Sequence, residues 1–236
     1  MKTLVIIPAY NEELNIEKTV NKIIKYNKKS KNQIDYVVIN DGSTDETLNV
    51  CRKNNYNVIP LIKNLGIGGA VQTGYKYAYE NDYDIAIQFD GDGQHDENYI
   101  DKLIDEIEKG YDFVIGSRFV SELSKFKSTG TRRFDIKILS LLIKVFTGKK
   151  IYDPTSDFRA ANKKVIKIFA KNYPTEYPEP ESTTDLIRKN FKIIEIPVEM
   201  HKREQGTSSI RPLKSIYYMF SVSIAIIITS IYREGK

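Results

Sequence analysis

Short runs of Val, Ile and Leu recur along the first half of the chain, and segments with helical spacing separate them. Near-continuous apolar runs of this length are typical of strands buried on both faces, as in a parallel sheet covered by helices. Strands that alternate with helices predict an α/β domain. The predicted strands are TLVIIPA (3–9), DYVVIND (35–41), YNVIPLI (56–62), DIAIQFD (84–90) and DFVIGS (112–117).

Helical spacing marks several of the segments between these strands. In residues 16–24, isoleucines and a valine fall at i, i+4, i+7 and i+8, which is one face of a helix. Ser43 followed by Glu46 has the spacing of a capping box and predicts that a second helix starts there. A third apolar stripe at 103–107 predicts a helix that ends at Gly110.

After the fifth strand the pattern changes. A basic amphipathic helix is predicted at about 131–147 and another helix at 183–190, followed by a strand in KIIEIPVEM (192–200). The polar segment DPTSDFRAANKK (153–164) and the Pro-rich segment YPTEYPEPES (173–182) are predicted as connections.

The C-terminal segment 215–232 is apolar for four or five turns. A membrane-spanning helix needs about 20 apolar residues, so this segment is marginal. Tyrosines near both of its ends favour an anchor on a membrane surface, with a core helix or an oligomer contact as alternatives. We therefore predict one domain at 1–211 and a separate apolar helix at 212–236.

Composition fits one globular domain and excludes some kinds of chemistry. The 236 residues are enough to bury a sizeable core, and the net charge of +5 without a stacking motif gives no indication of a nucleic-acid partner. The single cysteine, Cys51, excludes a disulfide framework within one chain and suits a reducing compartment. No charged leader precedes the first strand, so we expect no signal peptide and a cytoplasmic protein.

Polar motifs follow all five of the first predicted strands. Ligands of open α/β sheets bind beyond the carboxyl ends of the strands, so these motifs predict one polar rim. The motifs are PAYNE (8–12), NDGSTD (40–45), KNLGIGGA (63–70), DGDGQH (90–95) and GSRF (116–119).

The motif DGDGQH places two aspartates, Asp90 and Asp92, on either side of Gly91. Carboxylates this close repel one another unless a cation lies between them. Mg²⁺ and Mn²⁺ commonly take one or two carboxylates together with substrate phosphate oxygens, and Gln94 offers a further oxygen. A solvated turn is the alternative. An EF-hand is excluded because it needs glycine where His95 stands.

The glycine cluster at 64–74 matches neither nucleotide-binding fingerprint. A dinucleotide motif would need glycine where Val71 stands, and a P-loop that begins at Gly69 would need Lys-Ser or Lys-Thr after Gly74. The cluster predicts a tight loop into a helix whose N-terminus could face an anion, or a close-packed turn. Asp41, at the end of the second strand, is placed either to bind a nucleobase or ribose or to serve only in a turn.

Taken together, the motifs resemble those of family 2 glycosyltransferases of the GT-A fold, and most of all the dolichol-phosphate-mannose synthase branch and its bacterial polysaccharide relatives. The resemblance spans residues 3–211. It implies a Rossmann-like, mostly parallel sheet flanked by helices, and inverting transfer of a sugar from a nucleotide-sugar to a polyprenyl-phosphate or lipid-linked saccharide in cell-surface glycan synthesis. It rests on IPAYNE, NDGSTD, NLGIGGA, QFDGDGQH, GSRF, DPTSDFRA and KREQGTSS, in the family's order.

The resemblance also implies roles for individual residues. The expected cofactor is Mg²⁺ or Mn²⁺. The implied residues are Pro8, Ala9, Tyr10, Glu12, Asp41, Gly69, Asp90, Gly91 and Arg203 for the nucleotide-sugar, Asp90, Asp92 and Gln94 for the metal, and Arg118 and Arg159 for the acceptor.

The family pattern D-x-T-S-G-F-R reads DPTSDFR here, with Asp157 in the place of glycine. An aspartate at that position is a proposed base in some polyprenyl-phosphate glycosyltransferases. Asp157, Asp153 and Glu181 are therefore the candidate bases, and the alternative for each is a structural carboxylate paired with Arg159 or Arg188. A phosphate acceptor would need no base, because it is already an anion.

The resemblance further implies a peripheral protein on the cytoplasmic face of a membrane. The basic helix 131–147 suits an anionic membrane surface, and a homo-oligomer is compatible with the sequence. Two other functional classes are less favoured. A catalytically inactive regulatory protein of the same fold would not need the Asp90 and Asp92 pair, and a sugar-phosphate nucleotidyltransferase usually has a Gly-rich basic loop where PAYNEE stands.

Overall fold

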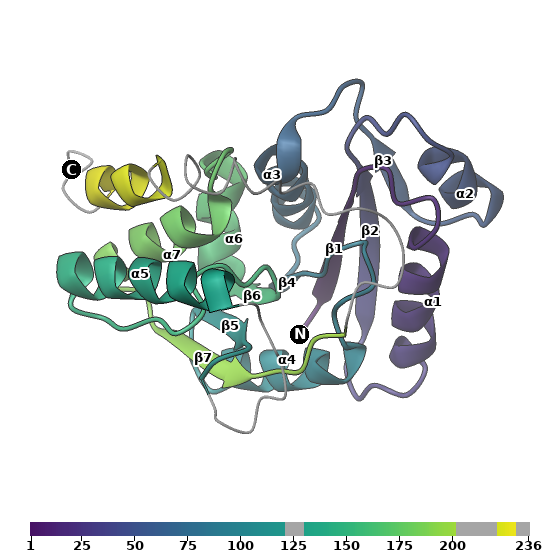
Figure 1. Cartoon of the computed structure of the whole chain (residues 1–236). Coiled ribbons are helices and arrows are strands. Elements are labelled where there is room, and N and C mark those ends of the chain that lie inside the picture. Colours follow the sequence, from purple (N-terminus) through teal and green to yellow (C-terminus); the bar gives the residue numbers. More distant parts are fainter. Residues whose placement is uncertain (121–129, 202–220, 230–236) are drawn as a thin grey trace.

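The computed structural model describes residues 1–120, 130–201 and 221–229, and in this part of the chain seven strands form one sheet in the order β3-β2-β1-β4-β6-β5-β7 (Figure 1). The strands are parallel except for β6, which runs antiparallel to both β4 and β5. The elements are β1 (Thr3–Ala9), α1 (Ile16–Asn27), β2 (Ile34–Asn40), α2 (Thr47–Lys53), β3 (Val58–Pro60), α3 (Gly66–Glu80), β4 (Ile85–Gln88), a 3-10 turn (Glu97–Tyr99), α4 (Ile100–Glu108), β5 (Phe113–Ser117), α5 (Gly130–Thr147), β6 (Arg159–Asn162), α6 (Lys163–Lys171), α7 (Pro178–Arg188) and β7 (Ile193–Pro197).

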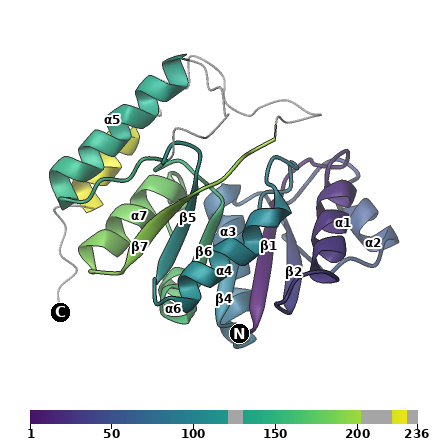
Figure 2. The same cartoon turned by 90° about the horizontal axis from the view of Figure 1, so that it is seen from below.

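Helices cover both faces of the sheet (Figures 1 and 2). Alternate residues of β1 point to opposite faces, because side chains along a strand alternate with a period of two. Leu4 and Ile6 belong to the core beneath α3, α5, α6 and α7, whereas Val5 and Ile7 belong to the core beneath α1, α2 and α4. The predicted α/β class with a mostly parallel sheet is confirmed.

Most predicted elements occur within one or two residues of their predicted bounds. The clearest difference among the strands is β3, which has three residues and lies at the sheet edge, where Pro60 needs no ladder partner for its nitrogen. The third predicted helix ends as expected, because Gly110 follows α4 with φ of 98°.

The predicted capping box is wrong. Helix α2 begins at Thr47, and the side chain of Glu46 makes no capping bond. The Ser43 hydroxyl instead accepts a hydrogen bond from the backbone N–H of Asn11 at 3.0 Å. The serine therefore joins the loops that follow β1 and β2, and this long-range hydrogen bond replaces the predicted capping bond.

Two features of the second half were missed. Helix α7 begins at Pro178 rather than at 183, because prolines are tolerated in a first helical turn, where no intrahelical N–H bond is needed. Strand β6, with the sequence RAAN, lies inside the segment predicted as a connection. Its small side chains carry no strand pattern, and the pairing with β4 and β5 makes it a strand.

The described part of the predicted C-terminal helix is helical at 221–229, and the rest of 215–232 lies outside the described residues. Val222 and Ile226 are buried in the same core as Leu139 and Ile143 of α5. Within the described residues, no helix has the length and apolar character required to cross a bilayer.

Candidate functional site

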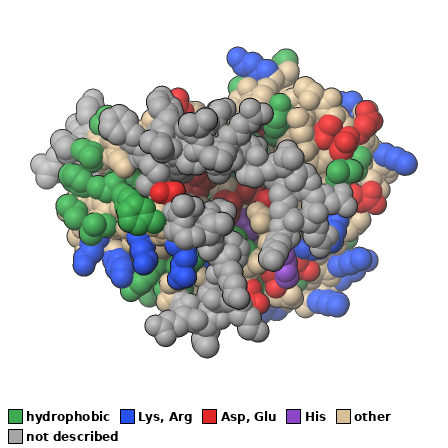
Figure 3. Space-filling model, in the orientation of Figure 1, with side chains coloured by type: hydrophobic (Ala, Val, Ile, Leu, Met, Phe, Trp, Pro, Cys, Tyr) green, Lys and Arg blue, Asp and Glu red, His purple; other side chains and the backbone are tan. Residues whose placement is uncertain are grey.

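A cleft opens where the order of the strands in the sheet reverses, between β1 and β4. Strand β1 lies between β2 and β4, so the loops after β1 and β4 diverge at a topological switch point. Polar side chains gather in the hollow at the centre of the face in Figure 3, where acidic groups are visible. The cleft has a volume of about 440 Å³ and is lined by Pro8, Ala9, Tyr10, Glu12, Asp41, Asn64, Gly66, Ile67, Ala70, Asp90, Gly91 and Asp92.

Asp41 holds the segment before α3, which forms one wall of this cleft. It is 2% exposed, and its Oδ1 accepts a hydrogen bond from the backbone N–H of Leu65 at 2.7 Å, just before α3. Burial raises the pKa of Asp41, although the N–H groups of Leu65 and Gly66 act in the opposite direction. The carboxylate that was predicted to meet a nucleobase or ribose therefore also fixes the start of α3.

The glycine cluster serves mainly close packing. A Cβ at Gly74 would stand 2.2 Å from Cγ2 of Ile6, and one at Gly68 would stand 2.3 Å from the carbonyl oxygen of Pro174. Gly69 lies in α3 but does not line the cleft, whereas Gly66 and Ala70 do. Because these positions have no side chain, α3 can lie this close to β1 at Gly74 and to the segment after α6 at Gly68.

The turn after β4 presents the two aspartates to the cleft. The N–H of Gly91 donates to the carbonyl of Pro8 at 3.2 Å, and the hydroxyl of Thr19 donates to the carbonyl of Gly91 at 3.1 Å. Asp92 Oδ1 accepts from the N–H of Gln94 at 3.0 Å. Asp92 is therefore held in a local turn that is bonded to both β1 and α1.

A buried histidine connects this turn to the segment before β6. The backbone N–H of Asp90 donates to Nδ1 of His95 at 3.1 Å, and Nε2 of His95 lies 2.9 Å from Oδ1 of Asp157. Because Nδ1 accepts, Nε2 carries the ring proton and donates it to Asp157. The ring is 1% exposed and stacks on Phe158 at a centroid distance of 4.8 Å, so its orientation is fixed.

The carboxyls of Asp90, Asp92 and Asp157 form one electrostatic group. Burial, followed by the charges of Asp157 and Asp92, raises the pKa of Asp90 well above its usual range. Burial acts in the same direction on Asp157, but the His95 ring, a hydrogen bond with Asp90 and the Arg118 charge outweigh it and lower that pKa. The pKa values of Asp90 and Asp157 are therefore shifted in opposite directions, upward for Asp90 and downward for Asp157.

These carboxylates fit a hard divalent cation. A proton or a metal ion at Asp90 would offset the burial and the neighbouring negative charges that raise its pKa, and oxygen donors are the ligands that Mg²⁺ and Mn²⁺ prefer. Gln94 donates its amide nitrogen to the carbonyl of His201 at 3.2 Å, which leaves its amide oxygen for another partner. No group of three or more His, Cys, Asp or Glu residues suited to a metal occurs among the described residues, so substrate oxygens would have to complete the coordination.

On the other side of the rim, Arg118 and Asp153 form a buried ion pair. Nε and Nη2 of Arg118 each donate to Asp153 at 2.7 Å, and the two side chains are 4% and 0% exposed. Glu195 of β7 accepts the backbone N–H of Asp153 at 2.8 Å. Asp153 thus pairs with Arg118, and not with the arginines considered from the sequence.

Arg159 occupies the interior of the fold. Its guanidinium is 1% exposed and donates to the carbonyls of Ser156, Pro154 and Glu179 and to the hydroxyl of Ser182. In this conformation it ties β6 to α7 and presents no surface to the cleft. The acceptor-binding role predicted for Arg159 stays a prediction.

The two acids of PEPES face different surroundings. Burial raises the pKa of both to about 7. The charges of Arg159, Asp157 and Arg118 also act on Glu179, whereas Glu181 lines a groove with Pro174 and Ile228. Positions two apart on a helix point to different sides, and the charges of the rim residues Asp157 and Arg118 act on Glu179.

The remaining predicted residues are placed as follows. Tyr10 is 45% exposed at the cleft, and Glu12 is 9% exposed and accepts the amide of Asn15 at 2.8 Å. Arg203 lies outside the described residues. His95 and Asn64 were missed. His95 is the last residue of the DGDGQH motif, and that position is the only signal that could have predicted a role for it.

Comparisons with known proteins agree with this architecture. The family model "Glycosyl transferase family 2" matches residues 4–169, more than half of the chain. The UDP-N-acetylglucosamine–dolichyl-phosphate N-acetylglucosaminyltransferase of Methanococcus voltae is 30% identical over 93% of this chain and 95% of its own length. The polyprenol monophosphomannose synthase of Mycolicibacterium smegmatis is 26% identical over 94% of this chain and 86% of its own.

Among solved structures, glucosyl-3-phosphoglycerate synthase of Mycobacterium tuberculosis is similar in fold. Its complex with Mn²⁺, UDP and glucosyl-3-phosphoglycerate has a TM-score of 0.70 at 18% identity, covering 99% of this chain and 82% of that chain. At this identity the likeness concerns the fold alone, which is the GT-A fold.

Proposed function

This chain belongs to glycosyl transferase family 2 and is a glycosyltransferase, and we propose that it moves a sugar with inversion from a nucleotide-sugar to a polyprenyl-phosphate or a lipid-linked saccharide with the help of Mg²⁺ or Mn²⁺. The relatives from Methanococcus voltae and Mycolicibacterium smegmatis are named for dolichyl-phosphate and polyprenol acceptors, which supports the acceptor class. Nucleotide-sugar and metal use are supported by the neighbour crystallised with UDP and Mn²⁺.

The charge of the cleft is the observation that carries the proposal. Among the described residues, the lining includes the carboxyls of Glu12, Asp41, Asp90 and Asp92 and no lysine or arginine. A nucleoside diphosphate is itself an anion, so it would be repelled from this cleft unless a cation came with it. A divalent ion bound by Asp90 and Asp92 resolves this conflict and stabilises the charge that develops on the leaving diphosphate.

On the donor side, the residues that line the cleft are proposed to bind different parts of the nucleotide-sugar. Asp41 and Tyr10 bind the nucleoside, and the backbone at Pro8 and Ala9 lies against its ribose and diphosphate. Gly91 lines the cleft, and because a Cβ there would stand 3.0 Å from the carbonyl oxygen of Pro8, glycine lets this turn lie against β1. Arg203, outside the described residues, is proposed to contact the donor diphosphate.

On the acceptor side, we propose that Asp157 is the base that accepts the proton when the acceptor is a hydroxyl. The assignment rests on position, because Asp157 is 34% exposed and is oriented by His95 beside the metal-binding turn, while its lowered pKa keeps it ionised but makes it a weaker base. Asp153 is proposed to position Arg118, since both oxygens of that carboxylate bind the arginine. Glu181 is the weaker candidate for the base, because it faces the groove beside the 221–229 helix.

Joint binding of metal and nucleotide tests the donor half. A thermal-shift series would use UDP, GDP and dTDP, each alone and with Mn²⁺. A ligand at about 100 times its Kd stabilises a protein by about 2.7 kcal/mol, or roughly 5–10 °C for a chain of this size. We expect such a shift for one nucleotide only when Mn²⁺ is present. An equal shift without metal would contradict the proposal.

Turnover of two variants tests the base. Asp157→Asn is expected to lower sugar transfer to a hydroxyl acceptor by about 10² or more, whereas Glu181→Gln keeps it. If Glu181→Gln alone loses turnover, Glu181 is the base. If both variants keep turnover with a hydroxyl acceptor, the base assignment is wrong.

We also propose peripheral association with a membrane, because the acceptors named for the relatives are lipids. The domain division at 211, the cytoplasmic side of the membrane and a homo-oligomer remain predictions.

A further inference from the structure

Helix α5 has two apolar stripes rather than one. Ile136, Leu139 and Ile143 are at most 4% exposed and pack into the core. Phe134, Leu141 and Val145 lie on the opposite side of the helix, at i, i+7 and i+11, and are 64%, 60% and 67% exposed. An ordinary surface helix presents polar residues on its outward face, so this second stripe needs an explanation.

Cations flank the outward stripe along one edge. Arg133, Lys137 and Lys144 are exposed and lie at i, i+4 and i+11, beside Leu141 on the helix surface. The acid of α5, Asp135, lies toward the opposite edge. Figure 3 shows hydrophobic side chains gathered over α5 at the left, with a row of Lys and Arg directly below.

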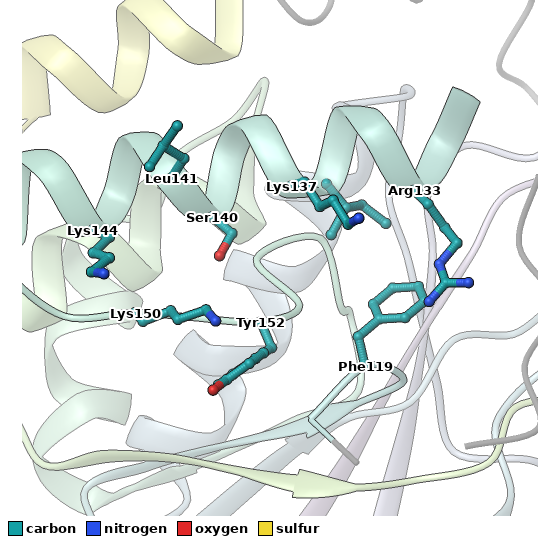
Figure 4. A pocket seen from close by; sticks show the side chains of 9 residues that line it. Phe119, Arg133, Lys137, Ser140, Leu141, Lys144, Lys150 and Tyr152 are labelled. Atoms are coloured by element: carbon teal, nitrogen blue, oxygen red, sulfur yellow. The ribbon is translucent and has the colours of Figure 1, made fainter. Parts of the chain in front are cut away.

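Beneath the basic edge lies a groove of about 440 Å³. Figure 4 shows Ser140 and Lys144 projecting from α5 toward Lys150 and Tyr152, while Leu141 points to the other side of the helix. The charged side chains that line the groove are Arg133, Lys137, Lys144 and Lys150, all of them cations. The groove therefore suits an anionic group whose neighbouring surface is apolar.

The 221–229 helix extends the apolar surface. Figure 1 shows it at the same end of the molecule as α5 and α7. It buries Val222 and Ile226 in the shared core but leaves Ile224 40% and Ile228 58% exposed. Two neighbouring helices thus combine buried inner stripes with exposed outer ones.

We propose that the outward face of α5, defined by Phe134, Leu141, Val145 and the cations Lys137 and Lys144, docks on an anionic lipid surface with the helix axis in the membrane plane. Apolar side chains beside a basic edge are the pattern of helices that lie in the headgroup region. A nucleic acid would require cations along the centre of the stripe, which is apolar here. The proposal deepens the membrane association proposed above and rests on it for the identity of the lipid acceptor.

The position of the face relative to the cleft suits such an acceptor. Phe119 lines the groove, and its ring lies 5.9 Å from the Arg133 guanidinium and 5.4 Å from that of Arg118. Arg118 in turn binds Asp153 at the rim. A headgroup held in the groove would therefore lie beside the acceptor side of the site.

Flotation of the full chain with lipid vesicles tests the docking face. Vesicles of phosphatidylcholine alone would be compared with vesicles of equal parts phosphatidylcholine and phosphatidylglycerol, at low and high salt. Wild type is expected to bind the anionic vesicles and to be released by salt. Each basic residue near such a surface contributes about fivefold in binding, so Lys137→Glu with Lys144→Glu should lower the partition coefficient by about 25-fold or more.

The apolar stripe is tested by Leu141→Ser with Val145→Ser, which should lower the partition coefficient by about tenfold or more. Matched controls carry the same substitutions elsewhere, namely Lys28→Glu with Lys29→Glu and Leu14→Ser with Ile62→Ser. The four residues changed in these controls are exposed, and the control variants should bind vesicles as wild type does. Because all these variants change exposed positions, they should keep the thermal transition of wild type.

Three results would overturn the docking face. They are absence of wild-type flotation, equal flotation of the α5 variants and wild type, or a vesicle-free dimer in light scattering that Leu141→Ser with Val145→Ser dissociates. The joint Mn²⁺ and nucleotide shift, measured on the same preparations, separates this proposal from the donor site. Loss of flotation with that shift intact rejects only the docking face, and flotation without the shift rejects only the donor proposal.

Discussion

The two halves of the sheet rim differ in how they neutralise their acids. In the half after β1, β2 and β4, burial and then the charges of Asp157 and Asp92 raise the pKa of Asp90. In the half around β5 and β6, Asp153 is bound by Arg118 and Asp157 by His95. The acids of the first half can therefore bind an external cation, whereas Asp153 and Asp157 in the second half already have partners within the fold.

The comparison suggests different consequences for mutations in the two halves. Removal of an acid from the first half should abolish a ligand-dependent activity and leave the fold intact. Removal of Asp153 from the second half should cost stability, because its buried partner Arg118 then loses its counter-charge.

The largest effect is expected for Asp90→Asn with Asp92→Asn. Donor cleavage with Mn²⁺ should fall by about 10³, which corresponds to about 4 kcal/mol of transition-state stabilisation. The raised pKa of Asp90 means that its ionised form opposes folding at neutral pH, so the metal-free variant should be no less stable than wild type. Asp82→Asn, at a side chain that is 86% exposed, is the matched control for both measurements.

Asp153→Asn should have the next largest effect, this time on stability. It leaves the Arg118 guanidinium, 4% exposed, without its carboxylate, and a broken buried pair costs about 3–5 kcal/mol in the free energy of unfolding. Urea titration measures this loss in the free energy of unfolding. Lys31→Met breaks an ion pair with Asp105 whose side chains are 60% and 38% exposed, and should change stability little. Similar losses for both variants would remove the distinction between the two halves.

The smallest effect concerns Glu181 and pH. Burial, followed by the charges of Glu176 and Glu179, raises its pKa from 4.5 to about 7, so between those pH values the folded chain keeps a proton that the unfolded chain has released. Stability should therefore fall as the pH rises through this window. Glu181→Gln should reduce that loss by roughly 1–2 kcal/mol, allowing for partial exposure.

Urea titrations at pH 5 and pH 8 measure this difference. Glu80→Gln, at an exposed position, is the matched control and should not alter the pH dependence. A Glu181→Gln variant with the pH profile of wild type would show that the carboxyl ionises in the folded chain as it does in the unfolded one.

The two halves also differed in how far the sequence predicted them. Motifs such as DGDGQH and PAYNE directly follow parallel strands, and the carboxyl ends of such strands meet at one edge, so the lining of the donor cleft could be read from local patterns. The bond between His95 and Asp157 joins residues 62 positions apart, and that between Arg118 and Asp153 joins residues 35 apart. Both of these bonds depend on the position of β6, and the RAAN sequence of β6 gives no local indication of a strand.

Strand β6 has a consequence for how the chain folds. Residues 159–162 fill the space between β4 and β5, which pair with β6 and not with each other. During synthesis, β4 and β5 therefore each keep an unpaired edge until about two-thirds of the chain has been made. Open edges of this kind favour association with other chains, and the pairing of β6 closes one edge of each strand at the same time.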